Sequence, residues 1–198
     1  MPETRRKVII VTDGDRCAGR TVKVAATNVG ARFISLTTGN PTPISGQEVV
    51  KLIKQTPHDP VVIMVDDTGK RGFGIGEQVL KYVTEHPDIE VIGAVAVASN
   101  TTSTEGVRVD ESVTREGKVV QGPVNKLGSP EKAGHKFLEG DTVDILSQLK
   151  IPVIIGTGDT GKMDFADDYC KGAPVTTRAL REIISRSEGN AGNNEFYS

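Results

Sequence analysis

Short apolar runs alternate with amphipathic segments along the first hundred residues. Uninterrupted apolar residues are typical of strands buried on both faces of a parallel sheet. Such runs occupy residues 8–11, 61–65 and 91–98, and a further strand is predicted over 33–36. Segments between them carry apolar residues at helical spacing, for example Val49, Leu52 and Ile53. This strand–helix rhythm predicts a doubly wound, mainly parallel sheet with helices on both faces.

The pattern changes after residue 98. Residues 99–140 are rich in Ser, Thr, Gly and charged residues. Val107, Val109 and Val113 alternate with polar residues, and apolar residues 119–120 follow the turn-like pair Glu116-Gly117. We therefore expect a β-hairpin, followed by a long loop over 122–140 of the length at which loops are usually functional or disordered.

The remaining segments return to the first pattern. A helix is expected near 141–149, a fifth strand near 152–155, and a last helix after Pro174. Residues 188–198 are polar and rich in Gly and Asn, which predicts a disordered tail. The sequence thus predicts a single α/β domain over residues 1–187 with a three-layer, mainly parallel, Rossmann-like sheet and a hairpin-and-loop insertion near 99–140.

Aspartates stand where several of the predicted strands end. In open α/β sheets, ligands bind outside the carboxyl ends of the strands, so these carboxylates should meet at one edge. Their mutual repulsion calls for a hard cation or for neighbouring Lys and Arg side chains. The predicted ligand-binding residues are Asp13, Asp15, Asp66, Asp67, Lys70, Arg71, Asp159 and Lys162.

Within this set, Asp13, Asp66 and Asp67 are the predicted ligands of a Mg²⁺ or Ca²⁺ ion. The alternative interpretation is structural, because aspartates at strand–helix junctions commonly cap helices and turns. The residues alone leave both interpretations open.

The loop at 156–162 resembles a phosphate-binding P-loop in its spacing of Gly156, Gly161 and Lys162. That motif requires Ser or Thr next, to hold Mg²⁺, but Met163 follows here. Nucleoside triphosphate binding is therefore disfavoured. The chain also lacks a Rossmann glycine fingerprint and any catalytic signature, so no catalytic residue is predicted and we expect a protein that is not an enzyme.

Composition narrows the choice of partners. The formal net charge is −2 and 4% of residues are aromatic, with no Trp, so we expect no nucleic-acid partner. The only cysteines are Cys17 and Cys170, too few for a disulfide framework, which favours a reducing compartment. No apolar run approaches the roughly 20 residues of a membrane span. The apolar run after the charged start is too short for a signal peptide.

Taken together, these segments resemble the soluble form of stage V sporulation protein AE from spore-forming Firmicutes. The resemblance spans about residues 6–186. It is carried by residues 7–15 with Thr12-Asp13-Gly14-Asp15, by 35–43 with Gly39-Asn40-Pro41-Thr42-Pro43, by Asp66-Asp67 and the glycine loop after it, by 95–100, by Gly140-Asp141-Thr142-Val143, and by 158–163.

This resemblance implies a role in the group of proteins that move dipicolinic acid, with calcium, into the forming spore and release it on germination. It implies a cytoplasmic location in the sporulating cell and forespore, peripheral to the spore inner membrane. The partners it implies are membrane components of the dipicolinate channel. A homo-oligomer is left open. In a further alternative, dipicolinate itself binds to Lys70, Arg71 and Lys162, since planar carboxylates suit Arg.

The chain also has a distant likeness to Toprim domains, the Mg²⁺-binding modules of topoisomerases and primases. Their first strand ends in Glu and a later strand ends in Asp-x-Asp. Asp13 takes the first place here, and Asp66-Asp67-Thr68 takes the second. The likeness implies, as the alternative function, a Mg²⁺-dependent phosphoryl-transfer enzyme in which Asp13, Asp66 and Asp67 hold the metal.

Overall fold

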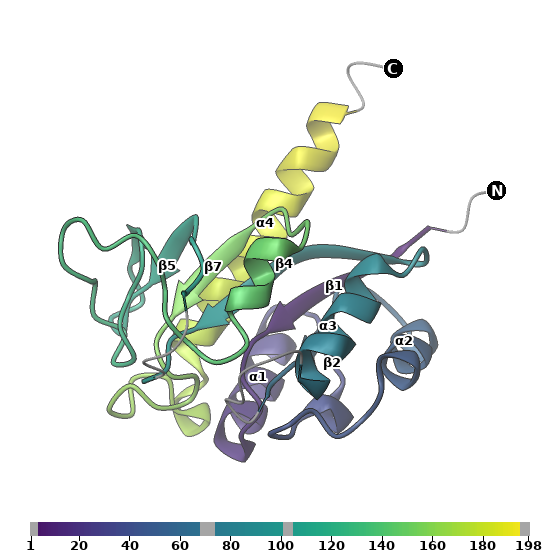
Figure 1. The fold of residues 1–198 in the computed structure, drawn as a ribbon, viewed down its shortest axis with the longest axis horizontal. Coiled ribbons are helices and arrows are strands. Elements are labelled where there is room, and N and C mark those ends of the chain that lie inside the picture. The colour runs from purple at the N-terminus through teal and green to yellow at the C-terminus, as the bar shows by residue number, and fades with distance from the viewer. Residues whose placement is uncertain (1–3, 68–73, 101–104, 195–198) are drawn as a thin grey trace.

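A computed structural model describes residues 4–67, 74–100 and 105–194 (Figure 1). Its sheet has seven strands in the order β2-β3-β1-β4-β7-β5-β6, and every neighbouring pair is parallel except β5 with β6. The strands are β1 (Arg6–Val11), β2 (Arg32–Phe33), β3 (Val61–Met64), β4 (Ile89–Val97), β5 (Glu111–Val113), β6 (Val119–Gln121) and β7 (Ile154–Thr157). The predicted three-layer, mainly parallel α/β fold is confirmed.

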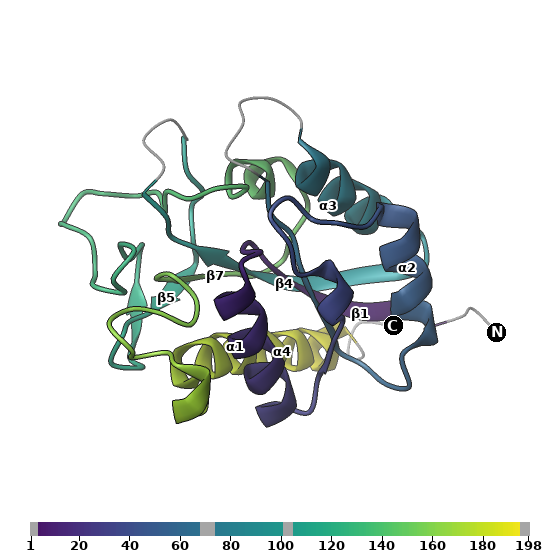
Figure 2. The same cartoon turned by 90° about the horizontal axis from the view of Figure 1, so that it is seen from below.

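Helices cover both faces of this sheet (Figure 2). They are α1 (Arg16–Asn28), α2 (Gly46–Gln55), α3 (Ile75–Glu85) and α4 (Pro174–Asn194), with 3₁₀ turns η1 (Ser35–Thr37), η2 (Asp144–Gln148) and η3 (Tyr169–Lys171). Helices α1 and α4 lie on one face, and α2 and α3 lie on the other. Consecutive side chains of β1 point to opposite faces of the sheet, so Ile9 packs with α1 and α4, and Ile10 packs with α2 and α3.

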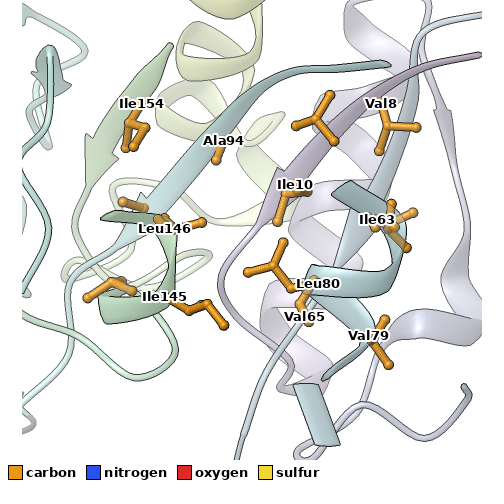
Figure 3. Close-up of a cluster of buried hydrophobic side chains, with 14 of the residues drawn as sticks. Val8, Ile10, Ile63, Val65, Val79, Leu80, Ala94, Ile145, Leu146 and Ile154 are labelled. Atoms are coloured by element: carbon orange, nitrogen blue, oxygen red, sulfur yellow. The ribbon is translucent and has the colours of Figure 1, made fainter. Parts of the chain in front are cut away.

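The second of these cores is shown in Figure 3. Ile10 and Ile63, from the central strands, meet Leu80 of α3, and Leu146 of η2 closes the same layer beside Ala94 of β4. Burial on both faces explains why β1 and β3 have no polar residue between 8 and 11 or between 61 and 64. The rigid central strands fix the position of the residues that follow them.

Three elements differ in extent from the sequence prediction. The strand expected over 33–36 is only two residues long and continues as η1, and the helix expected near 141–149 is the short η2. The hairpin exists as β5 and β6, although Val107 lies outside it and pairs with Leu138 instead. The predicted domain end at residue 187 and the disordered tail stay predictions, while α4 continues to Asn194.

A helix that crosses a membrane has to be long and predominantly apolar. No helix within residues 4–67, 74–100 and 105–194 has both properties.

Candidate functional site: a polar pocket at the carboxyl ends of the strands

The chain leaves β1 toward β2 and β3 on one side and later reaches β4 and β7 on the other, so the strand order diverges between β1 and β4. Such a switch point is where ligands bind in doubly wound sheets. A cavity of about 180 Å³ opens there. We call it the carboxyl-end pocket, and its lining is Thr12, Asp13, Asp15, Asn40, Asp66, Val97, Ala98, Ser99, Lys126, Asp141, Asp159 and Lys162.

Asp13 is the first acidic residue after β1. One carboxylate oxygen, Oδ1, accepts hydrogen bonds from the backbone N–H groups of Gly14 (2.7 Å) and Asp15 (3.2 Å). The preceding Thr12 ties β1 to β4, because its hydroxyl accepts from the N–H of Val97 at 3.0 Å. Burial raises the pKa of Asp13 to about 7, and the negative charge of Asp15 adds to this effect.

Asp66 follows β3 and has 5% of its surface exposed. Its Oδ1 accepts from the N–H of Asp67 at 2.8 Å, and its backbone N–H donates to the Thr42 hydroxyl at 2.9 Å. Gly14 permits close approach here, since a Cβ at that position would lie 2.9 Å from Asp66 Oδ2. Burial, followed by the charge of Asp13, raises the pKa of Asp66 to about 7. Asp13 and Asp66 therefore form a pair in which both carboxyl groups resist ionisation at neutral pH.

Two lysines balance the other carboxylates of the pocket. The Lys162 ammonium lies 2.6 Å from Asp15 Oδ2 and 3.0 Å from Asp159 Oδ1, while Lys126 lies 3.6 Å from Asp159 Oδ2. Although burial acts in the opposite direction, the hydrogen bond from Lys162 lowers the pKa of Asp15. The same contacts raise the pKa of Lys162 against the effect of its burial. The pocket is thus divided into a carboxyl wall at Asp13 and Asp66 and an ion-paired wall at Lys162.

Asp67 is separate from this pocket. Its Oδ1 accepts from the N–H of Gly76 at 2.8 Å, and its Oδ2 accepts from the N–H of Glu77 at 3.0 Å, so both oxygens bind the first turn of α3. This is the helix-capping role that the residues left open. Asp15 combines the two roles, because it also caps α1 by accepting from the Ala18 N–H at 2.8 Å. Lys70 and Arg71, which were also predicted, lie outside the described residues.

The loop after β7 does not form a phosphate cradle. The N–H of Asp159 donates to the Lys126 carbonyl at 2.8 Å, and that of Lys162 donates to the Asp159 carbonyl at 3.1 Å. The N–H of Gly161 donates to Asp167 Oδ2 at 3.1 Å. Amides that are already bonded within the protein are not available to an anion, which fits the substitution of Met163 for the hydroxyl residue of a P-loop.

Sequence reasoning missed part of the lining. Asp141 binds Ser99 through a hydrogen bond from its own N–H to the Ser99 hydroxyl at 3.0 Å, and its charge contributes to the raised pKa of Asp66. Asn40 and Lys126 arrive from loops. Asn40 and Asp141 lie in segments that the resemblance had singled out, which was the available signal. Lys126 lies in the long loop and carried none.

Within residues 4–67, 74–100 and 105–194, no three His, Cys, Asp or Glu side chains gather as a ready-made metal cluster. The metal set Asp13, Asp66 and Asp67 accordingly stays a prediction. Asp13 and Asp66 line one cavity, whereas the Asp67 carboxylate binds helix α3.

The fold and the pocket define a doubly wound α/β protein with a small polar site at its topological switch point. A sequence profile of the family described as stage V sporulation protein AE1 matches residues 7–187. The chain belongs to this family, which gives it a sporulation-related role. Searches of curated proteins and of solved structures returned no match.

Proposed function

We propose that the protein is an accessory of the machinery that moves dipicolinic acid, with calcium, into the forming spore and releases it on germination. Membership of the sporulation family supports this role. In this proposal the protein acts in the sporulating cell and forespore, at the periphery of the spore inner membrane. There it docks on membrane components of the dipicolinate channel, and its ligand binds in the carboxyl-end pocket.

The observation that carries the ligand proposal is that Asp13 and Asp66 line one cavity and that the pKa of each is raised. Carboxylates that resist ionisation in an otherwise polar cavity gain most from a divalent cation, which replaces their protons. Carboxylate oxygens and amide oxygens such as that of Asn40, which also lines the pocket, are ligands that Ca²⁺ prefers. We therefore propose Ca²⁺, the cation that accompanies dipicolinate, as the ion that binds here.

The size of the pocket decides how the ion is held. A volume of about 180 Å³ corresponds to about six water molecules at roughly 30 Å³ each, below the roughly 300–1,000 Å³ of organic-ligand sites. A pocket of this size has room for an ion that keeps several waters and contacts Asp13 and Asp66 directly or through them.

Thermal unfolding with Ca²⁺, Mg²⁺ and Mn²⁺ titrated in turn tests the site. An ion at 100 times its dissociation constant stabilises by about 2.7 kcal/mol, which for a domain of this size raises Tm by about 5–10 °C. The shift should disappear in Asp13→Asn/Asp66→Asn and persist in Glu116→Gln, which removes an exposed carboxylate outside the pocket lining. An equal shift in all three proteins, or none in the parent, would refute the ion site.

Dipicolinate content of spores tests the cellular role separately. Spores that produce only Asp13→Asn/Asp66→Asn should accumulate less dipicolinic acid, and the Glu116→Gln strain should be normal. Normal dipicolinate in a strain lacking the protein would contradict the transport role while leaving the ion site intact. Mg²⁺ preference together with metal-dependent turnover of a phosphate ester would instead favour the Toprim-like enzyme, whose first two ligands would be the same Asp13 and Asp66.

A further inference from the structure

We propose that the surface formed by helix α1 and the segment before α4 binds directly to an anionic lipid surface. The proposal goes beyond the proposed function, because it concerns contact with lipid headgroups and not docking on a channel protein, and it does not depend on the carboxyl-end pocket. Helices α1 and α4 pack side by side on this side of the sheet (Figure 2). The surface, which we call the basic face, comprises Arg16, Arg20, Lys23, Phe165 and Lys171.

The cations of α1 form one stripe along its exposed side. Arg16, Arg20 and Lys23 are all exposed, and their spacing makes consecutive members neighbours on the helix surface. Helix α1 contains no Asp or Glu. None of the three cations forms a salt bridge with a residue in the described part of the chain. In a protein whose formal net charge is −2, this stripe is a local excess of positive charge that attracts an anionic partner.

Side-chain contacts join this stripe to the turn η3 beside α1. The Arg20 guanidinium donates to the Tyr169 hydroxyl at 3.2 Å and lies 5.6 Å from the centre of the Tyr169 ring. Two residues further along the chain, the Lys171 ammonium donates to the carbonyl of Phe165 at 2.9 Å and lies 5.9 Å from the centre of the Phe165 ring. The α1 stripe, Lys171 and Phe165 therefore belong to one continuous surface.

The carboxylates that border the basic face have other partners. Asp15, at the start of α1, is paired with Lys162. Asp164, next to Phe165 in the chain, lies 3.0 Å from Arg115 Nη1, and Asp168 caps η3. None of these three carboxylates forms an ion pair with a cation of the basic face, which leaves those cations to an external anion.

Phe165 adds an apolar anchor to the basic face. With 71% of its surface exposed, it is the most exposed large apolar side chain in the described part of the chain. Met163, Asp164 and Phe165 have φ values of 51°, 52° and 64°, in the left-handed region that is unfavourable for residues other than glycine. This turn buries Met163, whose exposure is 1%, and leaves the Phe165 ring outside. Strain of this kind is frequent where a side chain has to be presented for a function.

A bilayer fits this surface better than a nucleic acid does. Single strands bind to aromatic rings on which successive bases stack. Tyr169 already lies under the Arg20 guanidinium, which leaves Phe165 as the one ring of the basic face that a base could reach. An anionic bilayer offers headgroups to the whole stripe of cations and an apolar layer to a single ring. The partner class is therefore an anionic phospholipid surface.

Co-sedimentation of the complete protein with vesicles of phosphatidylglycerol or of phosphatidylcholine tests the basic face. The protein should sediment with the anionic vesicles alone, and less of it should do so as salt screens the charges. A Lys or Arg near an anionic surface changes the affinity about fivefold, so Arg16→Gln/Arg20→Gln/Lys23→Gln should weaken binding by about 100-fold. Phe165→Ala should weaken it by about tenfold and keep its salt dependence, because only an apolar contact is lost.

The matched control is Lys51→Gln/Lys54→Gln/Lys81→Gln, which removes three exposed cations from α2 and α3 on the opposite face of the sheet. It should change the affinity by less than about threefold, as expected for distant screened charges. All six substituted side chains are exposed, and an unchanged Tm would confirm that both triple variants are folded.

Three outcomes would overturn the proposal: no sedimentation with anionic vesicles, equal sedimentation with neutral vesicles, or equal losses in the two triple variants. Tighter binding to duplex DNA than to vesicles, weakened by the same α1 substitutions, would assign the basic face to a nucleic acid instead. The vesicles contain no protein, so these outcomes are independent of docking on a channel component and of the dipicolinate content of spores.

Discussion

Asp66 and Asp67 are adjacent aspartates that follow β3, but they have opposite roles. Asp66 lines the carboxyl-end pocket, and burial beside Asp13 raises its pKa to about 7. Asp67, the next residue, is almost as buried, with 7% of its surface exposed. Both of its oxygens accept N–H groups at the start of α3, and one of them, Oδ1, is 2.8 Å from Gly76 N.

This difference shows that an aspartate at a strand end is not a ligand by virtue of its position alone. Two backbone N–H groups of α3 donate to the Asp67 carboxylate, so this side chain contributes to stability as a helix cap. Asp66 accepts one N–H and otherwise meets other carboxyl groups, so its ionised form costs stability. Substitutions at the two residues should therefore have effects of opposite sign.

The largest effect is expected for Asp67→Ala. The substitution leaves the N–H groups of Gly76 and Glu77 without their acceptor and removes the cap of α3. We expect a loss of about 2–3 kcal/mol in the free energy of unfolding, measured by urea denaturation. Asp67→Asn, which keeps one acceptor oxygen, should lose less. Equal stability of Asp67→Ala and the parent protein would show that α3 does not depend on this cap.

A smaller effect of the opposite sign is expected for Asp66→Asn. The raised pKa means that folded Asp66 holds a proton between about pH 4 and 7, where the unfolded chain, with its usual pKa near 3.8, has released it. The free energy of unfolding should therefore fall as pH rises through this window and level off above about 7. The Asn variant lacks this cost, so it should be about 1–2 kcal/mol more stable than the parent at pH 8 and nearly equal at pH 4.

Urea denaturation at pH 4, 5, 6, 7 and 8 measures this difference. Glu116→Gln serves as the control, because its exposed side chain should leave the pH profile unchanged. If Asp66→Asn destabilises the protein at pH 8, ionised Asp66 is a stabilising group and the account of the carboxyl wall is wrong.

Much of the carboxyl-end edge of the sheet could be predicted from the sequence, because a local pattern of apolar residues identifies the strands that end there. Apolar runs identified β1, β3, β4 and β7 as buried parallel strands, and parallel strands bring their carboxyl ends together. That argument placed Asp13, Asp15, Asp66, Asp67 and Asp159 at one edge. All of them except Asp67 line the carboxyl-end pocket, together with Lys162, and their binding of a ligand stays a prediction.

Two features could not be predicted from the sequence and are visible only in the folded structure. Adjacent residues in extended backbone point to opposite sides, which explains why Asp66 and Asp67 separate, but only the position of α3 shows which of them meets a helix. The Val107–Leu138 bridge joins residues far apart in sequence, so no local pattern could predict it.

The smallest effect on stability, and the sharpest test of the ligand, is expected for Lys162→Gln. About 45% of the Lys162 side chain is exposed, so loss of its contacts to Asp15 and Asp159 should change the free energy of unfolding by less than about 1 kcal/mol. Its positive charge nevertheless borders the same cavity as Asp13 and Asp66. Removing one charge at a distance of roughly 8 Å, at an effective dielectric constant of about 40, changes the binding free energy of a cation by about 1 kcal/mol per unit of ligand charge.

Calcium affinity should therefore rise by at least about fivefold in Lys162→Gln when measured by calorimetry at low salt, and the gain should shrink as salt screens the charge. Lys23→Gln, which removes an exposed cation from α1 outside the pocket lining, should leave the affinity unchanged. An anion in the carboxyl-end pocket would respond in the opposite direction, because Lys162 would be one of its partners. Weaker binding of a dicarboxylate in Lys162→Gln, with no gain for Ca²⁺, would show that the pocket binds its ligand at the ion-paired wall and not at the carboxyl wall.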